Sequence, residues 1–241
     1  MKMLLPVFLL WGLSFPLFAT DLPDRIDISY AVTTGMGSGE LNETIKIEQN
    51  KNTHQYHITS EARPSGITKL IKPGSILRNS WGSITKLGLQ PTRFSDQRND
   101  KQPSVAIFDW NNDVLTLQHE NDEEEKSLPH GTLDRLSFSY NFVFSTPPEG
   151  SINAHITDGR TLEFIRYAVD KETLQTPIGE LDTIVLTMQR DNNDNLKRKI
   201  WLSTVHHMLP VRIVSIEKDG LELEKMVTNI NLSYADAYNT R

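Results

Sequence analysis

The sequence predicts a mainly β protein: one large, curved antiparallel sheet, barrel-like or half-barrel-like, with a single helix packed on it near residues 133–145. Three observations lead to this prediction. Apolar and polar residues alternate in many short runs, as they do in strands with one buried face. Links rich in Asn, Asp and Gly separate these runs at lengths typical of antiparallel hairpins. The runs number roughly a dozen, too many and too local for a parallel α/β sheet.

The first residues have the layout of a secretory signal peptide. Lys2 supplies a positive start, an almost wholly apolar run follows, and charge begins soon after Ala19, a suitable cleavage residue. The run of about 15 residues is short of the roughly 20 that a spanning helix needs. We therefore expect residues 1–19 to be a signal peptide and residues 20–241 to form a single β-rich periplasmic domain. An uncleaved N-terminal anchor is the alternative, because Leu17 fits poorly two residues before the cut.

Runs of period two follow one another along the rest of the chain. In the first of them, Ile26, Ile28 and Tyr30 share one face. β-branched and aromatic residues are frequent in these runs, as a pleated, half-buried surface prefers. Turn residues such as Asn111-Asn112-Asp113 and Asp158-Gly159 separate them. Further turns are expected at residues 50–52, 191–195 and 219–220, and strands at residues 26–30, 40–49, 54–63, 105–110, 114–118, 151–157, 161–169, 178–190, 197–202, 211–218 and 221–230.

One segment has helical spacing instead. Its apolar residues fall three or four apart, at Leu133, Leu136, Tyr140, Val143 and Phe144. Thr132 can cap the start, Asp134 suits the first turn, and Pro147-Pro148 prevents continuation. We expect this helix to place one apolar stripe on the concave face of the sheet. A weaker helical turn is expected over Ser65–Lys72.

Composition narrows the classes of function. The chain has 241 residues, no Cys and a formal net charge of -6. A mildly acidic surface does not attract nucleic acid or anionic lipid. The lack of Cys excludes a disulfide framework, a Cys nucleophile and a thiolate metal site. No stretch after the first segment is long and apolar enough to cross a membrane. The acidic run Asp122 to Glu125 indicates a solvated turn and sheet edge.

The sequence contains no catalytic signature, so no catalytic residue is assigned. It has no G-x-S-x-G elbow, phosphate-binding loop, dinucleotide fingerprint or H-E-x-x-H pair. Gly35, Gly37 and Gly39 alternate as in a flexible anion-binding loop, but no helix follows them to supply a positive N-terminus. We interpret them as a Gly-rich hairpin turn or bulge.

Two stretches suggest a metal site, and neither meets the requirements. The residues at the first, third, fifth and twelfth positions of a calcium loop are Asp109, Asn111, Asp113 and Glu120. Position six is Val114, where Gly is needed, and the stretch also fits a strand, a turn and a strand. His206-His207 lacks a third ligand, and His54 and His57 face opposite sides of a strand. We therefore assign neither a metal nor a cofactor.

Three tryptophans follow the first segment, and all are expected in strands: Trp81, Trp110 and Trp201. Their flat faces could line a binding cleft, but packing in the core or at a sheet edge is the ordinary role of such residues. They are therefore not assigned to a site.

The order of the turn and strand segments is more informative than any motif. The succession is Gly88-Leu89-Gln90-Pro91-Thr92-Arg93-Phe94, Phe108-Asp109-Trp110, Leu133-Asp134-Arg135-Leu136-Ser137, Asp158-Gly159-Arg160, Thr176-Pro177-Ile178-Gly179, Trp201-Leu202 and Leu209-Pro210-Val211-Arg212-Ile213. Behind a signal peptide, this order resembles the bacterial exported family called domain of unknown function 3108, over roughly Ile26 to Leu232. The resemblance implies a periplasmic, mainly antiparallel β protein, and it implies no activity, ligand or catalytic residue.

These observations lead to three hypotheses. A curled sheet must cover both faces or enclose something. The first hypothesis is therefore non-catalytic binding of an apolar or amphipathic envelope molecule, lipid-like or otherwise small, in the concavity. The second is an interaction or scaffold protein of the envelope that uses a sheet edge or loop. The third is a hydrolase acting on envelope glycan or lipid, which needs a base and a nucleophile within reach of each other. The ligand-binding residues and protein partners are not predicted.

The exported form should begin at Thr20, because cleavage after Ala19 fits the signal-peptide layout. Intact-mass measurement of protein from the periplasmic fraction checks this prediction. Protein recovered from the cytosol with Met1 still attached would contradict it.

Overall fold

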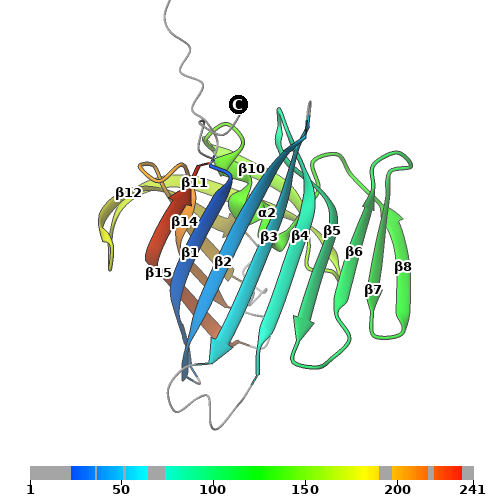
Figure 1. Ribbon diagram of the computed structural model, residues 1–241, viewed down its shortest axis with the longest axis horizontal. Helices are drawn as coiled ribbons and strands as arrows, with labels where there is room; N and C mark the ends of the chain where they lie inside the picture. Colours follow the sequence, from blue (N-terminus) through cyan, green and yellow to red (C-terminus); the bar gives the residue numbers. More distant parts are fainter. Residues whose placement is uncertain are drawn as a thin grey trace, which may run out of the picture.

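The computed structural model describes residues 23–35, 37–50, 53–64, 74–189, 197–216 and 220–234. All strands in this part of the chain belong to one 15-stranded sheet, which confirms the predicted mainly β fold. Figure 1 shows the sheet curving around a single short helix, α2 (Arg135–Tyr140).

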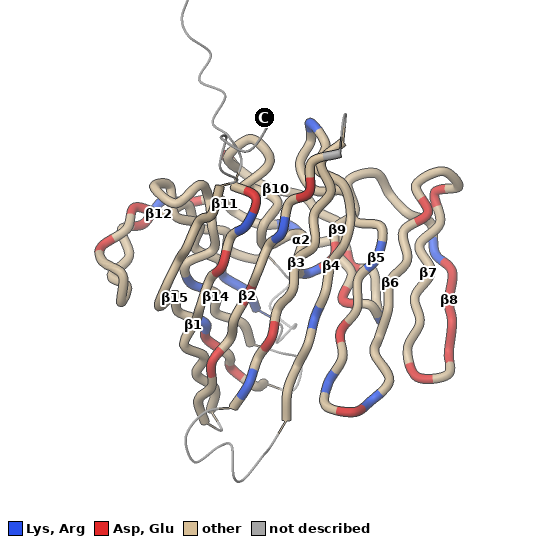
Figure 2. The backbone as a smooth tube through the Cα atoms, in the orientation of Figure 1, with Lys and Arg blue, Asp and Glu red and all other residues tan. Residues whose placement is uncertain are grey.

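The first half of the sheet is a simple meander. Each strand from β1 to β8 pairs antiparallel with the next, so spatial order follows chain order. β8, at the free edge, carries the exposed acidic run Asp122 to Glu125, which confirms the predicted edge but places the run in a strand and not in a turn (Figure 2). The strands are β1 (Arg25–Thr34), β2 (Gly37–Asn50), β3 (Thr53–Pro64), β4 (Ile76–Thr85), β5 (Gly88–Arg98), β6 (Ser104–Asp109), β7 (Val114–His119) and β8 (Asp122–Ser127).

The second half joins the first through the N-terminal strand. β15 pairs antiparallel with β1, from Arg25 opposite Ser233 to Thr34 opposite Leu223. The order then runs back through the chain to the short strand β9, which pairs parallel with β10. These strands are β9 (Leu133–Asp134), β10 (Ser151–Thr157), β11 (Leu162–Thr176), β12 (Gly179–Gln189), β13 (Lys197–Ser203), β14 (Leu209–Ile216) and β15 (Glu222–Ser233).

The sheet rolls until its second half meets the first without a strand ladder. β9 lies against β5, and Arg160 Nε, which follows β10, donates to Ser104 Oγ at the start of β6 over 3.1 Å. Strands β6, β7 and β8 continue beyond this junction (Figure 1). The sheet thus has the predicted barrel-like curvature, and β6, β7 and β8 extend outside the rolled part.

Three hairpins share one turn chemistry. In each, the Thr that ends the first strand donates its hydroxyl to the carbonyl of the Gly that begins the second, and that Gly has a positive φ, which favours glycine. The pairs are Thr34 with Gly37 (3.0 Å, φ 151°), Thr85 with Gly88 (3.0 Å, φ 109°) and Thr176 with Gly179 (2.7 Å, φ 122°).

The turns predicted at 111–113 and 158–159 are confirmed. The predicted turns at 50–52 and 219–220 lie partly outside the described residues. The turn at 191–195 and the helical turn over Ser65–Lys72 lie wholly outside them.

The predicted helix exists, but its start differs from the prediction. Asp134, not Thr132, is the N-cap: its Oδ1 accepts from the backbone N–H groups of Leu136 (2.8 Å) and Ser137 (2.9 Å). The Ser137 hydroxyl accepts from the N–H of Asp134 in return, which completes a capping box. Thr132 bonds instead to the carbonyl of Pro129. One oxygen of the Asp134 carboxylate thus accepts from two backbone N–H groups at once.

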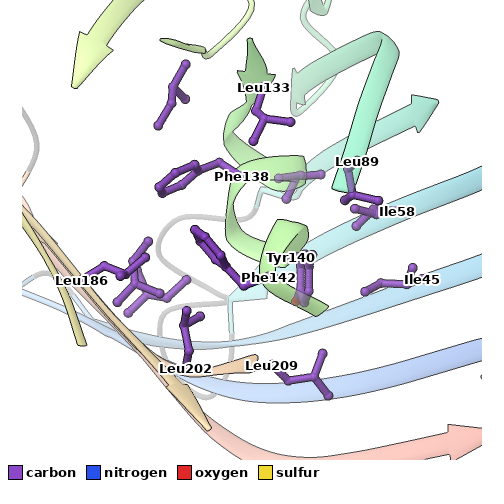
Figure 3. Close-up of a cluster of buried hydrophobic side chains, with 14 of the residues drawn as sticks. Ile45, Ile58, Leu89, Leu133, Phe138, Tyr140, Phe142, Leu186, Leu202 and Leu209 are labelled. Carbon is purple, nitrogen blue, oxygen red and sulfur yellow. The ribbon is translucent and has the colours of Figure 1, made fainter. Parts of the chain in front are cut away.

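The helix is also shorter and more buried than expected. It ends at Tyr140, and a 3-10 turn, η1 (Asn141–Val143), completes the segment before the prolines. Every residue from Leu136 to Tyr140 is buried, so the helix has no solvent face in place of the single predicted stripe. Figure 3 shows its aromatic side chains between Leu186 and Leu202 on one side and Ile45 and Ile58 on the other.

Both ends of the helical segment are tied to the sheet. Ser80 Oγ of β4 donates to the second carboxylate oxygen of Asp134 over 2.6 Å. The backbone N–H of Leu89 in β5 donates to Asn141 Oδ1 over 2.9 Å. A Cβ at Gly88 would lie 2.3 Å from the same Asn141 oxygen, so this position needs glycine for space as well as for φ. The helix is thereby fixed in place against the concave face.

Phe138→Ala should lower the free energy of unfolding by about 3–5 kcal/mol, because it empties the centre of the fold. The Phe138 ring is 1% exposed, stacks on Tyr167 at 5.1 Å and meets Phe142 edge-on at 5.9 Å. Urea unfolding provides the measurement.

Phe164→Ala is the matched control, because this ring on β11 is 57% exposed. Its cost should stay within about 0.5 kcal/mol. Equal losses for the two variants would show that the helix does not organise the core.

Candidate functional site

A row of polar side chains crosses the concave face beside the helix. Strand register places Glu43 of β2 opposite Ser60 of β3, Ser60 opposite Arg78 of β4, and Arg78 opposite Asp96 of β5. The next row on the same face consists of Ile45, Ile58, Ser80 and Phe94, by the same register. Charged residues at these inward positions are unusual, because ionised groups are rarely buried unless they are paired.

Glu43 is the centre of one half of the row. Its carboxylate is buried and accepts hydrogen bonds from Ser60 Oγ (2.7 Å), Lys225 Nζ (3.2 Å) and the hydroxyl of Tyr140. Tyr140 also lies 3.2 Å from the hydroxyl of Tyr30, which donates to the carbonyl of Pro210. This network connects the helix to β1, β2, β3, β14 and β15.

Burial by itself would raise the pKa of Glu43, but its partners outweigh this effect. The positive charge of Lys225 and the hydroxyls of Tyr140 and Ser60 hold the pKa of Glu43 below its usual value. The pKa values of Tyr30 and Tyr140 are raised well above 10, by burial first and then by the charge of Glu43. At neutral pH the network therefore contains one carboxylate and neutral hydroxyls that donate toward it.

Asp96 is the centre of the other half. One of its oxygens, Oδ2, accepts from both Arg78 Nε (3.1 Å) and Arg98 Nη2 (3.5 Å). Its Oδ1 is buried and has no hydrogen-bond partner within the described residues. Burial, followed by the positive charge of Arg135, lowers the pKa of Arg78 to about 10, so Arg78 remains a cation at neutral pH. The two arginines lower the pKa of Asp96 despite its burial.

Further cations surround this row. Lys225 of β15 is 13% exposed, and burial lowers its pKa to about 8, with Arg78 and Arg198 acting in the same direction. Arg198 of β13 donates to Ser139 Oγ of the helix over 3.3 Å. We call the following residues the inner charged cluster: Glu43, Arg78, Asp96, Arg98, Arg135, Arg198 and Lys225. Positive groups outnumber carboxylates within it.

A strip of apolar side chains lies directly next to the cluster. Register places Ala62 opposite Leu41 and Ile76, and Ile76 opposite Arg98. Val32 of β1 lies opposite Lys225. We call Val32, Ala62 and Ile76 the apolar strip; all three are half-buried, unlike the closed core around the helix. Along its strands, the concave face thus has three zones in order: the packed core, the inner charged cluster and the partly exposed apolar strip.

The serine–carboxylate pairs in this region do not form an accessible hydrolytic site. Ser60 bonds to Glu43 and Ser80 to Asp134, but the two serines are 1% and 0% exposed. Each carboxylate is also committed to several donors, Glu43 to the helix and to Lys225, and Asp134 to the helix cap. A nucleophile must reach its substrate, so these pairs are explained by their structural bonds.

The calcium-loop pattern proves to be a hairpin. β6 ends at Asp109 and β7 begins at Val114, and Asp109 Oδ1 accepts from the N–H groups of Asn111 and Asn112. The Gly35–Gly39 stretch lies at the β1–β2 hairpin, apart from residue 36, which lies outside the described residues. No group of three or more His, Cys, Asp or Glu residues that could hold a metal ion occurs in the described part of the chain.

The histidines do not converge. His206 and His207 lie in the turn between β13 and β14, where the Ser203 hydroxyl is 3.0 Å from His206 Nδ1. His54 and His57 are on β3, and the His57 ring stacks on Trp81 at 4.9 Å.

The tryptophans also have structural roles. Trp201 is buried in β13, with Lys199 and Arg212 over its ring. Trp110 lies not in a strand as predicted but in the turn that follows β6, and its indole N–H donates to the carbonyl of Pro91 over 2.6 Å. Among the described residues no helix has the length and hydropathy needed to span a bilayer.

The pH dependence of folding should report the burial of Lys225. Its folded pKa of about 8 lies below its unfolded value of 10.5, so the unfolded chain holds more protons between these values. Stability should therefore increase with pH from about 8 to about 9.5, by at most about 1.4 kcal/mol per pH unit. Above about pH 10 the buried tyrosines Tyr30, Tyr56 and Tyr140 reverse the trend, because their folded pKa values are raised.

Urea unfolding at about pH 7.5 and about pH 9.5 measures this slope. Lys225→Gln should flatten it, and Lys46→Gln, at an exposed position of β2, should not change it. An unchanged slope in the Lys225 variant would contradict the assignment.

Comparison with known proteins agrees with the fold and confirms the family that the sequence resembles. A β-barrel-like protein of domain of unknown function DUF1849 from Brucella abortus is similar in structure, with a TM-score of 0.50 and 7% identity, over 91% of this chain and 100% of that one. A DUF1329 family protein from Desulfovibrio piger has a TM-score of 0.27 and 9% identity, over 90% of this chain and 89% of that one. A search of the curated proteins gives no significant match. The sequence profile of the protein family of unknown function DUF3108 matches residues 25–225, and the chain belongs to that family.

Proposed function

We propose that this protein is a non-catalytic carrier or sensor that binds an amphipathic molecule of the cell envelope on the concave face of its rolled sheet, in the periplasm. The observation that carries the proposal is the lining of that face. Half-buried apolar side chains of the apolar strip lie beside buried charge, so an apolar group and a polar group of one ligand would both find partners. The signal-peptide layout of residues 1–19 supports the location.

The alternatives receive less support. A scaffold that recruits partners along a sheet edge needs an open edge, but β8 presents four consecutive carboxylates there, a common device against strand addition (Figure 2). The other edge, β9, is two residues long and buried. A hydrolase needs an accessible nucleophile, and the serines that bond to carboxylates in the inner network are covered by the helix and sheet.

Protein purified without detergent from the periplasm should carry an apolar molecule detectable by native mass spectrometry and solvent extraction. Ala62→Trp should reduce the amount bound severalfold, because an indole would occupy the apolar strip beside the cluster.

Asn231→Trp is the matched control, since Asn231 is an exposed residue of β15 beyond this strip. Equal loading of both variants and the wild type would place the ligand elsewhere. A protein that carries no apolar molecule and takes up none would contradict the proposed function.

A further inference from the structure

We infer that the inner charged cluster is the binding site for the anionic head group, a phosphate or a carboxylate, of the amphipathic ligand. This inference rests on the proposed function and specifies the ligand's class.

Charge is shared unevenly in the cluster. Arg78 and Arg98 bond to the same oxygen of Asp96, so two guanidinium groups meet one negative charge. Glu43, the other carboxylate, accepts hydrogen bonds from Lys225 and from the hydroxyls of Ser60 and Tyr140. Because ions removed from water are costly unless neutralised, two guanidinium groups that share one oxygen of a buried carboxylate favour an added anion.

Mutual repulsion among the cations agrees with this surplus. The charges of Arg78 and Arg198 both lower the pKa of Lys225, and the charge of Arg135 lowers that of Arg78. The strand register agrees: Arg78 and Glu43 both lie opposite Ser60, and Glu43 bonds to Lys225. An anion between them would relieve the repulsion and gain charge-assisted hydrogen bonds.

The cations are graded in exposure. The side chain of Arg98 is 46% exposed, whereas those of Arg78 and Lys225 are 12% and 13% exposed. An anion could thus first meet Arg98 and then Arg78. Arginine suits this task, because its planar guanidinium can bond to two oxygens of a phosphate or carboxylate at once. The buried Asp96 Oδ1, without a donor in the described residues, offers an acceptor to a hydroxyl of the same head group.

The apolar strip explains why the anion should carry a hydrocarbon chain. Ile76 lies opposite Arg98 across the strands, and Ala62 follows it in the same row. A chain leaving a head group bound at Arg98 would therefore meet half-buried apolar side chains. The overall charge of -6 does not oppose this, because the inner charged cluster itself holds five cations and two carboxylates.

Chain-matched probes test the inference: dodecyl phosphate, dodecanoate, dodecyl maltoside and dodecyltrimethylammonium, each below its micelle concentration, with inorganic phosphate as a head group alone. Isothermal titration calorimetry gives Kd for each. We expect the two anionic probes to bind about tenfold tighter than the maltoside, the cation to bind more weakly still, and the anionic advantage to shrink as salt is added. The ratio of dodecyl phosphate to dodecanoate then identifies the head-group chemistry.

Arg98→Gln should remove most of the anionic advantage and leave maltoside binding unchanged. Arg63→Gln is the control, since Arg63 is an exposed residue of β3 that pairs with Glu61, its side chain 69% exposed. A thermal melt verifies that each variant is folded, and the salt dependence of the wild type tests the inference without any variant.

The outcomes separate the two claims. If all four dodecyl probes bind with equal Kd, and neither salt nor Arg98→Gln changes the binding of the anionic probes, the inference is wrong and the proposed function stands. If inorganic phosphate binds as tightly as dodecyl phosphate, the cluster is an anion site but the chain contributes nothing, which contradicts the proposed function. If no probe binds, both are wrong.

Discussion

Asp134 accepts hydrogen bonds from two backbone N–H groups of the helix that it begins and from the hydroxyl of Ser80 on a strand that is not its ladder neighbour. The sheet order places β9 at one end and β4 well inside the opposite half. This buried carboxylate therefore joins parts of a rolled sheet that no ladder connects. Asn141 adds a second connection at the other end of the helical segment, to Leu89. With the helix fixed in this way, the concave face acquires a core instead of exposing its apolar side.

The same helix accounts for the charge inside the sheet. Tyr140 reaches Glu43, and Ser139 accepts from Arg198, so polar groups of the helix meet polar groups of the strands. A buried ion pair adds little to stability in comparison with apolar side chains of similar volume. We therefore propose that several cations and two carboxylates are retained in this position for recognition of a ligand. The apolar strip beside them is the reason why the proposed ligand is amphipathic.

Much of the fold could be predicted, because local patterns determine it. Alternation marked Ile26, Ile28 and Tyr30 as one face of a strand, and all three are buried. The Asn- and Asp-rich turns determined the hairpins that join neighbouring strands. The helix could be located by its spacing, but its cap could not, because Thr132 and Asp134 are both good capping residues and tertiary contact with Ser80 decides between them.

The inner charged cluster was not predicted, since charge on a strand is ordinarily assigned to the solvent face. A signal was nevertheless present: Glu43 occupies the apolar phase between Leu41 and Ile45, and Lys225 the same phase between Leu223 and Val227. A charged residue at a strand position where the alternation calls for an apolar residue indicates that the charge faces inward. Which of these residues meet depends on the register of strands far apart in the chain, as with Lys225 and Glu43, and no local pattern determines that.

The most direct test of this account is a crystal structure of the protein grown with dodecyl phosphate. The account predicts the phosphate within hydrogen-bond distance of the Arg98 and Arg78 guanidinium groups, with the chain lying on Ala62 and Ile76. A phosphate bound on the convex face, or a chain that lies away from these strands, would contradict it.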